Sequence, residues 1–308
     1  MPGPVSFSQI AAFRRCPLLC WLRYWARLPA PSPSSGGPAP GPSADVDPRL
    51  LGGLLHAAIR SLLDAGRWPG RGSPPGPGEL EGLVCALGAS RGWPAGAAGP
   101  YLSRAGRILE TLWGGPLASL EPWPGGVELE VSWLWPGRGT RMVAVVDCLA
   151  RTGRGRPLIL DFKATGGLSR PAMEEYGHQL RLYRMGLIAL EPEMAGAGLA
   201  VYHLPSGRLV PVAGGTDDDE ATRRMVDEAL EGMEAGRFPP AEACRKGAPV
   251  YCAYRPLCPY AAPVGGGAEA PRGGEGGEAG EGAGGEGRRG GDASGGGGEG
   301  EGGEMWEV

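Results

Sequence analysis

One short stretch, Pro157–Thr165, constrains the fold of this chain more than any other. Three branched apolar residues run into Asp161, Phe162 and Lys163, a pattern that predicts a short buried strand. Because strand side chains alternate between faces, we expect Asp161 and Lys163 to point one way and Phe162 the other. Burying an acid and a lysine without partners would be very costly, so the strand is expected to end at a polar site.

Lys163 also departs from the composition of the chain. Of the 30 basic residues only Lys163 and Lys246 are lysine, and all the others are arginine. A sequence that uses arginine almost everywhere else suggests that a compact point charge is needed at Lys163.

Two more apolar runs, residues 127–134 and 141–149, precede this strand. Each is followed by a glycine-containing turn, so the three runs predict an antiparallel meander. The second run carries Asp147 and the third carries Asp161. If the strands pair, the two carboxylates can converge on Mg²⁺ or Mn²⁺, because hard oxygen ligands suit these cations. Lys163 would then lie beside the metal-bound water or the scissile phosphate.

The order of the motifs resembles the PD-(D/E)XK nuclease superfamily, and its RecB-like branch, which includes AddB-type and CRISPR adaptation nucleases, is the most similar. The motifs are S-x-S at Ser6, C-P at Cys16, G-x-x-x-H ending at His56, Asp147, D-x-K at Asp161, and Q-x-x-x-Y at Gln179. The resemblance spans about residues 5 to 260 and is carried by the ordered set, since D-x-K alone is a weak signal.

The resemblance implies an α/β, restriction-endonuclease-like fold. Its central mixed sheet would contain the three-stranded antiparallel meander and be flanked by helices, with a helical N-terminal part. The implied activity is hydrolysis of DNA by a metal-dependent exonuclease. Asp147 and Asp161 would hold Mg²⁺ or Mn²⁺, helped by His56 and the carbonyl of Phe162.

The same resemblance implies roles for three further side chains. Lys163 would activate water or stabilise the phosphorane, and Gln179 and Tyr183, which share a helix face, would position the substrate. An acid on the first strand, Glu128 or Glu130, could join the metal, but we favour a solvent-facing strand acid at both positions.

Seven cysteines in a chain expected to be cytoplasmic favour metal ligation over disulfides. Iron–sulfur branches of the family imply a 4Fe–4S cluster on Cys16, Cys244, Cys252 and Cys258. The x7 and x5 spacings differ from the family's x2 and x5, so Cys20 is an alternative fourth ligand. Zinc is the alternative metal.

Composition divides the chain into two parts. Residues 264–308 are rich in glycine and glutamate, hold ten acids and three arginines, and predict a disordered tail. Residues 1–263 keep 27 basic and 24 acidic residues and are expected to form the nuclease domain. That domain would include a helical insert at about 48–115 and a cysteine-rich segment at 244–258. Its mildly basic balance permits DNA binding.

No apolar run is long enough to predict secretion or a membrane span, so we expect a cytoplasmic protein without a membrane partner. The chain contains no P-loop motif, so a helicase or a CRISPR or repair protein would be a separate partner. Two alternatives remain open at this point. One is an inactive or partner-dependent nucleic-acid-binding scaffold, and the other is a zinc-stapled interaction protein.

Overall fold

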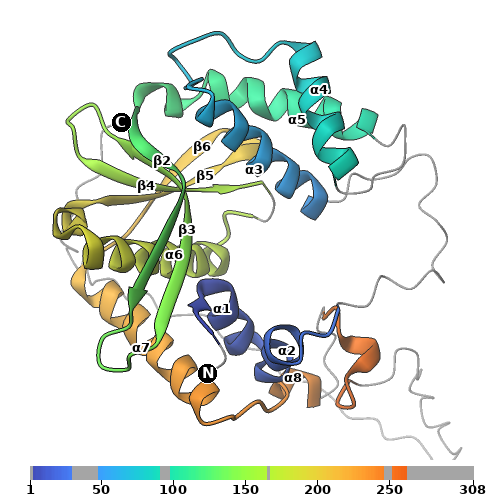
Figure 1. Ribbon diagram of the computed structural model, residues 1–308, viewed down its shortest axis with the longest axis vertical. Coiled ribbons are helices and arrows are strands. Elements are labelled where there is room, and N and C mark those ends of the chain that lie inside the picture. The colour runs from blue at the N-terminus through green and yellow to red at the C-terminus, as the bar shows by residue number, and fades with distance from the viewer. Residues whose placement is uncertain (1–2, 30–47, 91–97, 165–166, 246–251, 262–308) are drawn as a thin grey trace, which may run out of the picture.

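A computed structural model describes residues 3–29, 48–90, 98–164, 167–245 and 252–261 (Figure 1). A central sheet lies between two layers of helices. Its strands are β1 (Val5–Ser6), β2 (Glu121–Leu134), β3 (Arg141–Arg151), β4 (Pro157–Lys163), β5 (Gly198–His203) and β6 (Arg208–Val212). The α-helices are α1 (Phe7–Arg15), α2 (Pro17–Cys20), α3 (Pro48–Asp64), α4 (Pro77–Ser90), α5 (Ala98–Trp113), α6 (Arg170–Leu190), α7 (Thr216–Glu234) and α8 (Glu242–Arg245). The short helical turns are η1 (Trp21–Trp25), η2 (Pro116–Ser119), η3 (Pro192–Gly196), η4 (Leu204–Ser206) and η5 (Arg255–Leu257).

The strand pairings confirm the predicted fold class. β2, β3 and β4 form the antiparallel meander, β4 and β5 are parallel, and β5 and β6 are antiparallel. β2 runs along one edge of β3, while β1 and β4 occupy successive parts of the other edge. β1 pairs at Met142 and Val143, and β4 pairs from Cys148 onward. Asp147 therefore lies in the gap where β4 separates from β3.

Each face of the sheet has its own hydrophobic core. The first core lies against α1, α6 and α7, and the second against α3, α4 and α5 (Figure 1). In β4, Ile159 packs in the first core, while Leu158, Leu160 and Phe162 pack in the second. Because side chains alternate, Asp161 and Lys163 lie on the α6 side of the sheet, as the sequence predicts.

The regular alternation fails at Asp147. Val146 packs in the first core and Cys148 in the second, although positions two apart should share a face. β2 changes in the same way around Glu128, whose φ of 46° lies in the left-handed region that non-glycine residues seldom adopt. In both strands the side chains therefore change faces at the same height in the sheet, and Glu128 and Asp147 lie at this height.

The N-terminal part begins with an ordered cap. The Gln9 side chain accepts a hydrogen bond of 2.8 Å from the Ser6 N–H at the start of α1. Helix α2 passes directly into the π-helical turn η1. No helix of the described ranges is long and apolar enough to cross a membrane. The predicted disordered tail, residues 264–308, lies outside the described residues.

Candidate active site

The exit of β4 holds a buried ion pair. The Asp161 side chain is 3% exposed, and its Oδ2 lies 2.7 Å from Nζ of Lys163. No donor of the described residues approaches this oxygen with hydrogen-bond geometry, so the ion pair alone compensates it. A buried carboxylate oxygen that keeps unused lone pairs is suited to a further ligand, such as a cation.

Helix α6 completes the surroundings of Lys163. Nζ donates a hydrogen bond of 2.9 Å to Oε1 of Gln179 and lies 4.7 Å from the centre of the Tyr176 ring. Nε2 of Gln179 donates in turn to the Tyr183 hydroxyl at 2.6 Å. Burial, followed by the charge of Asp161, raises the pKa of Tyr183, so this hydroxyl keeps its proton and remains a donor.

Asp147 connects β4 to α3. Its Oδ2 accepts a hydrogen bond of 2.8 Å from the Phe162 N–H and lies 3.6 Å from Nδ1 of His56. Burial raises the pKa of Asp147 well above the usual value, and the charge of Asp161 raises it further. The Phe162 N–H and the Lys163 ammonium oppose that rise. The two carboxylates are therefore close enough to repel each other, an arrangement that a shared cation would relieve.

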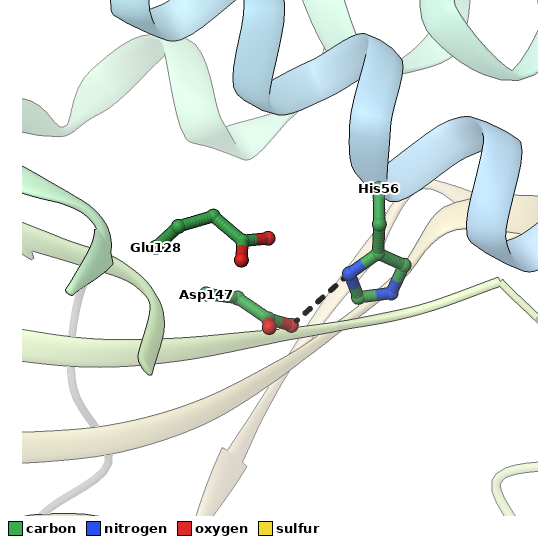
Figure 2. Close-up of side chains that lie close together, drawn as sticks. All are labelled: His56, Glu128 and Asp147. Carbon is green, nitrogen blue, oxygen red and sulfur yellow. Dashed lines mark ion pairs between the residues drawn. The ribbon is translucent and has the colours of Figure 1, made fainter. Parts of the chain in front are cut away.

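Glu128 approaches the same point from β2. Figure 2 shows His56, Glu128 and Asp147 directed toward one another, and a ligand atom from each lies within 4.8 Å of the other two. Glu128 is half-buried, with Nη1 of Arg60 3.8 Å from its Oε2. Two carboxylates and one imidazole form a donor set that fits Mg²⁺ or Mn²⁺. Asp161 is not part of this closest group, and its Oδ2 lies 2.7 Å from Nζ of Lys163.

Phe162 holds the two sides of the site in place. Its ring lies edge to face with His56 at 6.4 Å and with Tyr202 at 6.0 Å between ring centres. Its backbone N–H holds Asp147, so one residue fixes both the imidazole from α3 and the carboxylate from β3. His56 thus reaches the site from one helical layer and Gln179 from the other.

The cysteines form a second group, between the two ends of the described chain. Burial raises the pKa of Cys244, and the nearby thiols of Cys16, Cys258 and Cys252 raise it further. Cys16 Sγ accepts a hydrogen bond of 3.3 Å from the Ala241 N–H. Cysteine thiolates are ligands of iron–sulfur clusters and of zinc. Among the described residues, however, no three of these sulfur atoms lie within 4.8 Å of one another.

The environment of Cys20 differs from that of these four cysteines. It is fully buried, its Sγ donates to the Gln9 carbonyl at 3.4 Å, and burial raises its pKa to about 12. The Cys20 thiol is therefore engaged with α1.

A mixed sheet with this meander, ending in Asp-x-Lys between two helical layers, defines a restriction-endonuclease-like nuclease fold. The chain belongs to the PD-(D/E)XK nuclease superfamily, whose family model matches residues 4–259. A search of curated proteins finds no match.

Two solved structures resemble the chain at low identity. One is a candidate exonuclease from Eubacterium rectale, with 10% identity, a TM-score of 0.46, and coverage of 81% of this chain and 90% of that one. The other is SSO0001, with 16% identity, a TM-score of 0.31, and coverage of 68% and 84% respectively. Neither likeness is strong enough to carry an argument about the site.

Two candidate site residues were disfavoured or not named in the sequence analysis. Glu128 belongs to the group in Figure 2, whereas the sequence favours a solvent-facing acid there. Its position depends on the left-handed backbone, which no residue pattern signals. Tyr176 was detectable, since it precedes Gln179 by three positions and Tyr183 by seven, a spacing that places all three on one helix face.

Proposed function

We propose that the chain is a metal-dependent nuclease that hydrolyses phosphodiester bonds of DNA. The observation that carries the proposal is a chain of contacts from Asp161 through Lys163 and Gln179 to Tyr183. It lies at the same strand end as the group of His56, Glu128 and Asp147. An ammonium beside a set of hard ligands is what a reaction with a phosphate diester requires.

The metal ligands would be His56, Glu128, Asp147 and Asp161, with the carbonyl of Phe162. The fit is supported by the unused oxygen of Asp161 and by the repulsion that raises the pKa of Asp147. When bound, a divalent cation polarises the phosphoryl oxygen and lowers the pKa of a bound water. Since the protein ligands are carboxylates and one imidazole, Mg²⁺ and Mn²⁺ are the proposed cofactors.

The protein's own contribution is to hold one ammonium in place. Lys163 is anchored by Asp161 on one side and Gln179 on the other, so its remaining N–H can donate to a phosphate oxygen as negative charge develops. Tyr183 accepts from the Gln179 amide and thereby fixes which end of the amide faces Lys163. The raised pKa of Tyr183 keeps its own O–H available to a phosphate oxygen.

The finer assignments rest on the motif order. We infer a RecB-like exonuclease that acts on DNA ends in repair, recombination or CRISPR-type processing, together with a helicase or another partner. We also propose residues 1–263 as the nuclease domain.

The test uses protein purified without air and incubated with Mn²⁺ or Mg²⁺. End-labelled single-stranded DNA, duplex DNA and RNA of the same sequence serve as substrates, and closed circular single strands distinguish internal cutting. We expect release of short products from DNA ends, complete loss with EDTA, and at least a 100-fold loss in Asp147→Asn and Asp161→Asn. Asp217→Asn, an exposed acid on α7, is the matched control and should retain full activity. Cleavage that persists in the two site variants would refute the proposal.

We further propose that Cys16, Cys244, Cys252 and Cys258 hold a 4Fe–4S cluster, since the motif order implies these ligands and the Ala241 N–H, three residues before Cys244, donates to Cys16 Sγ. Its role would be to link the first helices to the last segment. Two contacts already do so, from the Leu18 N–H to the Pro239 carbonyl at 3.1 Å and from the Tyr254 hydroxyl to the Leu28 carbonyl at 2.8 Å.

The measurement is iron and sulfide content, with visible absorbance, of protein prepared without air. We expect four irons per chain and their loss in Cys244→Ser. Cys85→Ser changes an exposed thiol of α4 and should have no effect. Retention of the cluster in Cys244→Ser with loss in Cys20→Ser would transfer the fourth ligand to Cys20, and stoichiometric zinc without iron would refute the cluster.

A further inference from the structure

A cavity of about 340 Å³ lies beside the N-terminal strand, away from the acidic site. Its walls come from β1, α1 and η1, and include Gln9, Arg23, Tyr24, Trp25 and Arg27. The volume falls at the lower end of the range of sites that enclose small ligands, about 300–1,000 Å³. Two guanidinium groups and two aromatic rings in one hollow form the chemistry that binds a nucleotide.

Two uncommon backbone features build this wall. η1 is a π-helical turn, which is rare and often occurs at functional sites. It ends with the Leu28 N–H donating to the Leu22 carbonyl at 3.0 Å, across Arg27, whose φ is 50°. Glycine is the usual residue at such a left-handed helix end. An arginine here strains the backbone and places a positive charge at the cavity.

The positive charges of the cavity are not neutralised within the described structure. Neither Arg23 nor Arg27 has a carboxylate within ion-pair distance among the described residues, and Arg23 lies 5.2 Å from the centre of the Tyr24 ring. An adjoining cavity of about 440 Å³ offers a contrast. There Arg138 is paired at 3.0 Å with both Asp227 and Glu234, so its charge is less available to an anion than that of Arg23 or Arg27.

We propose that the cavity of Arg23, Tyr24 and Arg27 is a binding subsite for single-stranded nucleic acid. A base would stack on the aromatic wall while the two guanidinium groups contact the adjacent phosphates. This inference rests on the proposed nuclease function, to which it adds the path of the substrate.

The register of the sheet sets the distance between this subsite and the acids. β1 pairs with Met142, and Asp147 lies five residues further along β3. At about 3.3 Å per residue the separation along the strand is roughly 17 Å. A single strand stacked as in a duplex, with one phosphate per about 3.4 Å, would cover that distance in about five nucleotides, and an extended strand would need fewer.

Two further arginines, Arg14 and Arg15, lie on α1, the helix that also lines the cavity through Gln9. Arg14, in the last turn of α1, is close enough to His178 on α6 to lower its pKa, and His178 precedes Gln179. Arg15 acts in the same way on the thiol of Cys252. Through Arg14, positive charge therefore reaches α6 next to Gln179, the residue that contacts Lys163, as a path for a phosphate backbone requires.

The test measures binding apart from cleavage. Fluorescence anisotropy of a labelled 20-nucleotide oligothymidylate in EDTA gives the affinity of wild type, Arg23→Gln, Arg27→Gly and the control Arg107→Gln, an exposed arginine on α5. We expect each cavity variant to bind at least five-fold more weakly and its salt slope to fall by roughly 0.7, the loss of one phosphate contact. Arg27→Gly should be at least as thermally stable as wild type, because glycine tolerates the left-handed backbone.

Cleavage kinetics then give the position of the subsite. The KM values for single strands of three and of ten nucleotides are compared in wild type and in Arg27→Gly. If no subsite exists, the ratio of the two KM values should be the same in both proteins. We expect the wild-type advantage of the longer strand to disappear in the variant. Affinities equal to that of Arg107→Gln, or an equal loss on blunt duplex, would overturn the single-strand subsite. Weaker binding by the cavity variants in a protein that cleaves no substrate would support the subsite and refute the nuclease function.

Discussion

Replacing Lys163 by methionine tests whether the ion pair at the β4 exit is structural, catalytic or both. The change leaves Asp161 as a carboxylate with a 3% exposed side chain and no counter-charge. Removing one partner of a buried pair costs about 3–5 kcal/mol. Because the Lys163 side chain is 20% exposed and water reaches part of the pair, we expect the lower end, about 3 kcal/mol.

Two companion variants separate the interaction between Asp161 and Lys163 from the other contributions of each residue to the free energy of unfolding. Asp161→Asn leaves the ammonium with Gln179 and solvent, so we expect a loss of about 1–2 kcal/mol. The double variant Asp161→Asn with Lys163→Met buries no unpaired charge and should lose only about 1–2 kcal/mol. The double-mutant cycle then gives a coupling energy of about 3 kcal/mol.

The assay is urea unfolding of the four proteins in EDTA, followed by cleavage of end-labelled DNA with Mn²⁺. We expect the double variant to recover stability yet remain inactive, because the ammonium and one carboxylate are both absent. If Lys163→Met were as stable as wild type, with no coupling to Asp161, the pair would be effectively solvated and the reasoning from burial would fail. A double variant that cleaves DNA would remove Lys163 from the reaction.

Two further perturbations test the packing and the electrostatics. Gly186→Ala would place a Cβ 2.7 Å from the buried Trp133 ring and should cost about 1–3 kcal/mol in urea unfolding, whereas Gly82→Ala in open space on α4 should gain up to about 1 kcal/mol. Equal effects would contradict this account of the contact between α6 and β2. Burial, followed by the charge of Arg14, lowers the pKa of His178 below 6.5, so the unfolded state binds more protons just below that pH and stability falls on acidification. Between about pH 7.5 and about pH 5.5 the urea midpoint of wild type should therefore fall more than that of His178→Gln, and parallel decreases would refute the assignment.

The fold was largely predictable because the sequences of its strands show strong local hydrophobic patterns. The meander follows from three apolar runs separated by glycine turns, and α6 follows from its own periodicity. The π-helical turn η1 was not predictable, since residues 21–25 are compatible with an ordinary helix and the difference lies in backbone hydrogen bonds. The Ala26 N–H donates to the Trp21 carbonyl five positions back, a choice that side-chain type does not determine.

The site was predictable where a side chain continues a regular strand and unpredictable where the strand breaks. Asp161 and Lys163 obey the two-residue period of β4, so the sequence places them on one face. Asp147 and Glu128 lie where the side chains of both strands change faces. Beyond this point, the two-residue period assigns the next residues to the wrong face of the sheet. The preference for a solvent-facing Glu128 has this cause, because it assumed a regular strand.

The break in the strands and the buried polar row have a common explanation. Apolar side chains of similar size in place of a buried ion pair are often neutral or stabilising, so stability alone gives no reason to keep Asp161 and Lys163. Nor does packing explain a left-handed Glu128, which costs free energy that a glycine would avoid. Both departures from local consistency occur at one level of the sheet, between the two cores, and bring oxygen ligands and one ammonium together. Strain and buried charge that coincide in this way are expected at a site kept for chemistry.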